Sequence, residues 1–322
     1  MQYRDIVTRS FAITWRHKYL WLLAAFAGES GGASFNYSSP FQPTGNGGTS
    51  QSFTSIPQQV ATWLSHHIGL VLAISALFLV LLIAFFILAA VCEGALVRAS
   101  AEHDADRPFG LRLAWRTGVS TMGTIIGFRL LLIALALPVF IVVAALVGGF
   151  VVAIISGATG LAVALGLLGF LILLASFVYL LYLFFLDRLG TRAAVLEQVG
   201  ARAALIRGHR LLKKRLGRVL LVWLLSIATG IAVGICAAIV LAIVVLPITV
   251  AGIAAYASGS AFLWIVIIVG TVILLPIALV VEGFVIAQSS TYWTLAFRRM
   301  EIDQAPAYGY VPGAPPVIPS SS

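Results

Sequence analysis

Five runs of apolar residues, each long enough to cross a lipid bilayer as a helix, constrain this chain more than any other feature. A helix rises about 1.5 Å per residue, so about 20 apolar residues cross a hydrocarbon core of about 30 Å. Apolar residues make up 61% of the 322 residues and charged residues only 10%, whereas charged residues are about a quarter of a soluble domain. A soluble globule is therefore excluded, and we predict an all-α, polytopic transmembrane protein. The five runs are residues 68–92, 124–147, 161–186, 219–245 and 262–281.

The positions of the lysines and arginines predict how often the chain crosses. All 20 fall into four clusters, and residues 19–97, 130–187 and 219–297 contain none. Because Lys and Arg in short loops stay on the cytoplasmic side, each gap is expected to hold one crossing outward and one back. The chain would then cross six times as three tandem hairpins, with both termini cytoplasmic. The sixth span is Tyr19–Gly28, which has only about half the required length, and a five-span topology is the less favoured alternative.

The net charge of +9 indicates which partners to expect. The basic residues lie between apolar runs, so we expect them to face the anionic headgroups of the bilayer and not nucleic acid. This arrangement is typical of the cytoplasmic membrane of a prokaryote. Residues 28–60 are rich in Gly, Ser, Asn, Gln and Pro and are predicted to form a flexible outer loop. Residues 301–322, rich in Pro and Tyr, are predicted to form a disordered cytoplasmic tail.

Acidic residues end the second, fourth and sixth predicted spans and suggest an internal repeat. Glu93, Asp187 and Glu282 are 94 and 95 positions apart, and a shift of 94 also places Arg98 on Arg192. Each unit would consist of a basic amphipathic cytoplasmic helix, a span outward, a turn and a span back. Residues 1–300 would form one helical membrane domain. Its repeat-like units are residues 1–98, 99–192 and 193–290.

Four ionisable residues lie in or at the edges of the apolar runs: Glu93, Arg129, Asp187 and Glu282. A charge at the bilayer centre costs about 2.5–3.5 kcal/mol, so these residues need an explanation. They would either form a cytoplasm-facing polar cluster that binds a solute, a proton or a lipid headgroup, or have a structural role. In the structural role each acid pairs with an arginine of a neighbouring amphipathic helix, while Arg129 extends toward the inner surface. Their positions near the membrane boundary favour the structural role.

Residues 111–118 and 201–216 mix aliphatic and basic side chains at helical spacing. Such helices lie in the membrane interface with their basic faces toward anionic lipid. They would be a docking surface for lipid or a protein partner, or ordinary anchors between spans, and the second interpretation is favoured. The candidate contacts are Arg116, Arg210, Lys213, Lys214, Arg215 and Arg298.

Other local patterns predict packing, not chemistry. Gly230 and Gly234 match the small-xxx-small spacing that lets helices approach closely, and we expect internal helix packing there, with homodimerisation as the less favoured alternative. Cys92 and Cys236 are far apart within apolar runs, so we expect neither a disulfide nor a metal site. The chain has no phosphate-binding glycine-rich loop with lysine, no HExxH and no Gly-x-Ser-x-Gly motif. We therefore expect no enzymatic activity and no cofactor.

Three stretches resemble a broad family of uncharacterised prokaryotic six-span proteins. They are Glu93-Gly-Ala-Leu-Val-Arg, Ala114-Trp-Arg-Thr-Gly and Ser289-Ser-Thr-Tyr-Trp-Thr-Leu-Ala-Phe-Arg-Arg. The family is similar to the membrane domain attached to some glycerophosphoryl diester phosphodiesterases. The resemblance covers residues 1 to about 300 and implies a helical membrane fold. The phosphodiesterase activity is not implied, because the chain carries no stretch like the catalytic domain.

Two functions remain open at this point. The first, which we favour, is a non-enzymatic membrane scaffold or accessory subunit that engages a membrane protein partner or lipid through its basic helices. The second is a carrier for a small solute or lipid, with Glu93, Arg129, Asp187 and Glu282 lining an inward-facing site. A polar pocket at the midplane between kinked helices would favour the carrier, and a packed apolar centre would favour the scaffold.

Overall fold

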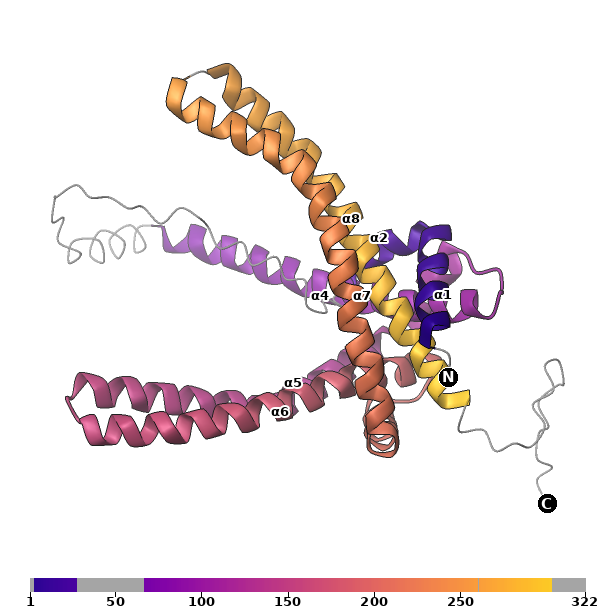
Figure 1. Ribbon diagram of the computed structural model, residues 1–322, viewed down its shortest axis with the longest axis horizontal. Helices are drawn as coiled ribbons and strands as arrows, with labels where there is room; N and C mark the ends of the chain where they lie inside the picture. Colours follow the sequence, from indigo (N-terminus) through magenta and orange to yellow (C-terminus); the bar gives the residue numbers. More distant parts are fainter. Residues whose placement is uncertain (1–2, 28–66, 260, 303–322) are drawn as a thin grey trace.

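The computed structural model describes residues 3–27, 67–259 and 261–302, and this part of the chain is helical throughout (Figure 1). Five of its helices are long and apolar enough to cross a membrane, which confirms the prediction of a polytopic all-α membrane protein. The helices are α1 (Tyr3–Arg16), α2 (Tyr19–Phe26), α4 (Ile68–Asp104), α5 (Leu111–Ile155), α6 (Thr159–Leu196), α7 (Ala201–Ser258) and α8 (Ala261–Ile302).

Each of the five long helices contains one predicted span and extends beyond it. One predicted amphipathic segment is not a separate helix, because residues 111–118 are the first turns of α5. The other, residues 201–216, begins α7 and is set off from the span by a kink. Within α7 the helical geometry is interrupted only at Arg215, where φ is −135° and ψ is 34°. The basic segment of α5 therefore continues directly into its span, whereas that of α7 joins its span through the kink at Arg215.

Buried residues concentrate at one end of the molecule, which we call the core end. It comprises α1, α2 and the segments of the long helices at and beyond the ends of the apolar runs, chiefly residues 90–104 of α4, 183–196 of α6 and 286–300 of α8. α8 packs against α1, α2, α4 and α7 there. Small residues such as Ala95, Ala193 and Ala287 are fully buried and let these helices lie close together.

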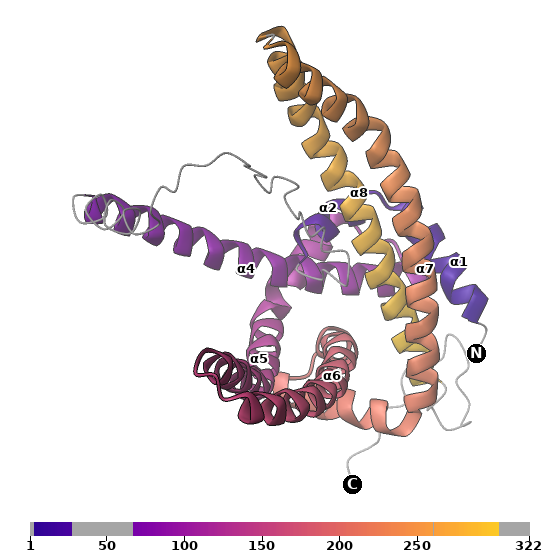
Figure 2. The same cartoon turned by 60° about the vertical axis from the view of Figure 1, so that its left-hand side comes forward.

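Away from the core end the spans diverge. α5 and α6 form one antiparallel pair and α7 and α8 form another, and Figures 1 and 2 show both pairs and α4 pointing in different directions. Gly157 and Gly259 adopt positive φ values of 71° and 65° in the connecting turns, a conformation that glycine adopts readily. None of the residues in the most apolar 18-residue stretch of α4, α5 or α8 is buried. The apolar surface of the spans is thus available to lipid or to other membrane helices.

The short helix α2 lies where the sixth span was predicted. Its eight residues reach only about 12 Å, so this helix does not cross a bilayer by itself. Leu20, Leu23 and Ala24 are instead buried at the core end, where α2 packs against α8 and α4. Residues 28–66 and 303–322 lie outside the described residues, so the sixth crossing, the outer loop and the tail stay predictions. The predicted tail begins too early, because α8 includes residues 301 and 302.

Glycines mark the closest helix contacts at the core end. A methyl group added at Gly118 of α5 would lie 2.2 Å from the Val91 carbonyl oxygen of α4. One added at Gly283 of α8 would lie 2.3 Å from the Trp21 carbonyl oxygen of α2. Neither carbonyl can move without shifting its helix, so these contacts require glycine.

We expect Gly118→Ala to destabilise the protein by about 1–3 kcal/mol, because overpacking against a backbone atom pushes α4 and α5 apart. Gly123→Ala on the same helix is the matched control, since a methyl group there meets no atom within 4 Å. The control should be neutral or stabilising by at most about 1 kcal/mol. Thermal unfolding of the detergent-solubilised variants measures both effects, and equal stability of the two would show that α4 and α5 are not in contact at this point.

Candidate functional site

Polar side chains are buried where α4, α6 and α8 meet at the core end. The Ser100 hydroxyl of α4 lies 3.0 Å from the Thr291 hydroxyl of α8. Arg192 of α6 is 1% exposed and donates to the Arg188 carbonyl at 2.8 Å and to the Ser290 hydroxyl at 3.4 Å. None of these side chains was predicted from the sequence to be a site residue. Two of the arginines could have been selected from the sequence. Arg188 and Arg192 follow a predicted span and are four positions apart, so they lie on the same face of one helix.

Glu93 and Arg129, two of the four predicted cluster residues, form an ion pair between α4 and α5. Glu93 is only 1% exposed and Arg129 is 17% exposed at the side chain. The pair gives both charges a counter-charge at the edge of the apolar run. The structural interpretation expected Glu93 to pair with an amphipathic helix and Arg129 to extend alone; the structure pairs them with each other.

The other two predicted cluster residues lie apart from this pair in the chain and differ in burial. Asp187 is half-buried on α6, and Glu282 is exposed on α8. In the described part of the chain no ion pair involves Glu282. The structure therefore pairs Glu93 with Arg129 and leaves Glu282 outside that pair.

Asp104 at the end of α4 joins three helices and was missed by the sequence analysis. Its carboxylate lies 2.9 Å from Nε of Arg9 in α1 and 2.6 Å from Nη1 of Arg298 in α8. Arg298 also donates to the Ala101 carbonyl at 2.8 Å. Arg298, a candidate lipid or partner contact, is therefore engaged inside the protein. In the sequence Asp104 is one of several charges in a short connection, and nothing local distinguishes it.

The other candidate lipid or partner contacts lie mainly on the outer surface. Lys213 and Lys214 are exposed at the end of the first segment of α7, while Arg215 is half-buried at the interruption of the helix. The opposite face of this segment is buried and packs against α6, where Gly208 approaches the backbone of Gly190. The apolar face thus contacts protein and not lipid. The exposed candidates are Arg116, Arg210, Lys213 and Lys214.

A second polar contact at the core end involves two histidines and a tyrosine. The rings of His17 and His103 stack with centroids 3.6 Å apart. The Tyr19 hydroxyl donates to the Phe109 carbonyl at 2.9 Å and lies 2.6 Å from Nε2 of His103. Because the hydroxyl has one proton, when it donates that proton to Phe109 it accepts a hydrogen bond from Nε2 of His103. Burial, and then the neighbouring His17, lower the pKa of His103 from 6.5 to about 4.

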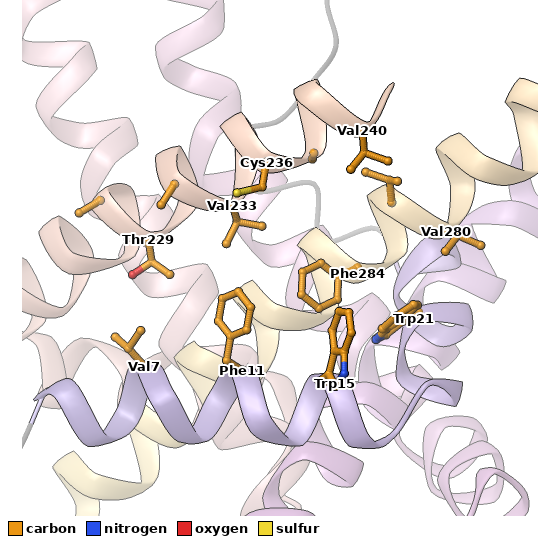
Figure 3. A pocket seen from close by; sticks show the side chains of 14 residues that line it. Val7, Phe11, Trp15, Trp21, Thr229, Val233, Cys236, Val240, Val280 and Phe284 are labelled. Carbon is orange, nitrogen blue, oxygen red and sulfur yellow. The ribbon is translucent and has the colours of Figure 1, made fainter. Parts of the chain in front are cut away.

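A cavity of about 790 Å³ lies between α1 and α2 on one side and α7 and α8 on the other. Figure 3 shows the rings of Phe11, Trp15, Trp21 and Phe284 gathered on one wall and Cys236 on the other. The ring centroids of Trp21 and Phe284 are 5.3 Å apart. The lining of this cavity is almost wholly apolar, so the cavity offers no acid, no base and no set of metal ligands. Among the described residues no group of three His, Cys, Asp or Glu is placed to hold a metal ion.

Residues 7–299 match DUF7544, a family of unknown function. The chain belongs to this family. The match covers both the core end and all five long helices, in agreement with the expected uncharacterised membrane family. It shows no link to the membrane domain associated with glycerophosphoryl diester phosphodiesterases. No curated protein and no solved structure matches the chain.

In this member of DUF7544 we expect Glu93→Gln to destabilise the fold by about 3–5 kcal/mol, because it leaves the Arg129 charge without its partner. The double variant Glu93→Gln/Arg129→Gln should lose less than the sum of the two single variants. Glu282→Gln, at an exposed glutamate, is the control and should change stability by less than about 0.5 kcal/mol. Unfolding in detergent gives the double-mutant cycle, and strictly additive losses would refute the pairing.

The His103 site predicts acid sensitivity. Because the folded pKa lies below 6.5, the unfolded chain binds more protons between about pH 6.5 and about pH 4. Stability should therefore fall as the pH drops through this window and level off below it. His103→Gln keeps a donor for Tyr19 but does not titrate, so its stability should depend less on pH. His209→Gln, at an exposed histidine, is the control; an identical pH dependence in His103→Gln and the wild type would contradict the assignment.

Proposed function

We propose that this protein is a non-enzymatic membrane scaffold or accessory subunit whose diverging spans hold partner membrane helices. The observation that carries the proposal is the divergence of α4, the α5–α6 pair and the α7–α8 pair from one core end (Figure 2). Helices that separate in this way do not enclose a path across the membrane. They do leave long apolar faces on which other helices pack, with the core end fixing the angles between them.

The core end supports this role because its charges are used to join helices. Asp104 connects α4 to α1 and α8, and Glu93 connects α4 to α5. Arg207 of α7 contacts Glu197 at 3.2 Å and Glu301 of α8 at 3.1 Å. A carrier would require Glu93, Arg129, Asp187 and Glu282 to line one site, whereas Glu282 is exposed on α8 and the Glu93–Arg129 ion pair joins two helices. The geometry therefore favours a scaffold over a carrier.

The proposed topology places the core end in the cytoplasm of a prokaryotic cell, with six crossings and both termini inside. All 20 lysines and arginines lie outside residues 130–187 and 219–297, so both far turns lack positive charge. The proposed repeat has structural support as well. α1 ends at a break before α2, and the first segment of α7 ends at the interruption at Arg215. Each of these two segments is basic and buries the side chains along one of its faces. Lys213 and Lys214 would face anionic headgroups or a protein partner.

A photocrosslinking experiment tests the scaffold function. Benzoylphenylalanine replaces Phe78 on α4 or Phe170 or Phe177 on α6, which are 67%, 66% and 64% exposed. Irradiation of intact cells should give, from at least one position, a single protein adduct of defined mass in stoichiometric yield. The same residue at Phe128, which is 0% exposed, is the control and should give none. If all three exposed positions give lipid adducts only, the spans do not hold a partner and the scaffold proposal fails.

A further inference from the structure

A second cavity, of about 500 Å³, lies among α6, α7 and α8. The part of this cavity that is nearest the core end of the molecule is polar. Arg188 and Gln288 line it and are 4% and 3% exposed. The guanidinium carbon of Arg188 lies 5.3 Å from the centre of the Phe184 ring. The Nε2 amide of Gln288 is buried and forms no hydrogen bond with the described residues. A buried donor of this kind is unfavourable unless an acceptor reaches it, so the cavity fits a ligand that brings one.

The other end of the cavity is apolar and lies on α7. Gly230 and Gly234, one turn apart, line it beside Ile227 and Ile231. The small-xxx-small spacing predicted close helix packing here, but a methyl group added at either glycine would meet no atom within 4 Å. The glycines therefore leave a shallow groove along α7 without side chains and do not receive a neighbouring helix. The prediction of internal packing is wrong at this site, because the α5–α6 pair diverges from α7.

The polar and apolar ends of the cavity are arranged like the headgroup and acyl chains of a membrane lipid. Arg188 comes directly after the predicted span 161–186, and Gln288 follows the predicted span 262–281. Gly230 and Gly234 lie inside the predicted span 219–245. Trp223 and Trp293 also line the cavity, and indole rings favour the level of the headgroups. The polar end is thus at headgroup depth, and the groove extends into the hydrocarbon.

We propose that this cavity binds one anionic glycerophospholipid from the leaflet at the core end. Its phosphate accepts a hydrogen bond from Nε2 of Gln288 and lies beside the positive charge of Arg188. One acyl chain lies in the groove over Gly230 and Gly234. This site goes beyond the scaffold function, because it uses a buried cavity and not the outer faces of the spans or the exposed basic residues of α7.

Native mass spectrometry of the full-length, detergent-purified protein tests the site, with dioleoyl phosphatidylglycerol as the probe. One lipid should stay bound per protein, and phosphatidylcholine should bind more weakly. Gln288→Leu should weaken binding about tenfold or more, as expected for one lost hydrogen bond to a charged phosphate. Gly230→Leu should also weaken it, because the side chain occupies the groove. Gly148→Leu on α5, where added atoms also meet nothing within 4 Å, is the matched control and should bind like the wild type.

Several outcomes would overturn the proposal. Equal retention of phosphatidylglycerol by the wild type, Gln288→Leu and Gly230→Leu would place the lipid elsewhere. Displacement of the lipid by inorganic phosphate, with no effect of Gly230→Leu, would assign the site to a free anion. If Gln288→Leu does not fold, Gly230→Leu and the phosphate competition still decide the question. The photocrosslinks from positions 78, 170 and 177 are read separately, so failure of either proposal leaves the other testable.

Discussion

The carboxylate of Asp104 joins α1, α4 and α8, and the rest of the core end depends on contacts of this kind. Arg9 and Arg298 reach it from two other helices at 2.9 Å and 2.6 Å. Charged groups are unfavourable in hydrocarbon, so they collect where the helices leave the apolar runs. At that level one carboxylate lies within ion-pair distance of two guanidinium groups and connects three helices. The ends of the long helices are thereby fixed, while their apolar segments remain free to diverge.

Glycine and alanine make this joining possible. Gly118 and Gly283 bring the backbone of α5 against that of α4 and the backbone of α8 against that of α2. Beyond the core end the helices carry large apolar side chains that lipid accommodates as well as protein does. Without a hydrophobic force to bring such faces together, nothing in the chain itself requires the spans to form a closed bundle. The proposed scaffold function and the proposed lipid site beside α7 both depend on that separation.

Much of the fold could be predicted from the sequence, and less of the site. All five long apolar runs are helical as expected, and Glu93 and Arg129 were selected because a charge there needs a partner. Their pairing with each other was not predicted, since helices α4 and α5 must first be placed side by side. Asp104 and Gln288 were not selected, because each looks like an ordinary polar residue near a span end. The spacing of Gly230 and Gly234 predicted a helix contact, and the structure shows a groove instead.

The sequence by itself determined which segments enter lipid and which stay at its surface, because hydropathy and charge act on each segment separately. It also determined that Glu93 could not stand alone. Only the tertiary structure decided which charges pair, that the apolar face of the first segment of α7 packs against α6, and that the spans diverge. Those properties depend on the angles and distances between helices. Several contacts set these angles jointly. Gly118 packs against the backbone of α4 and Asp104 forms its ion pairs from the end of α4, so two contacts of different kinds position the same helix.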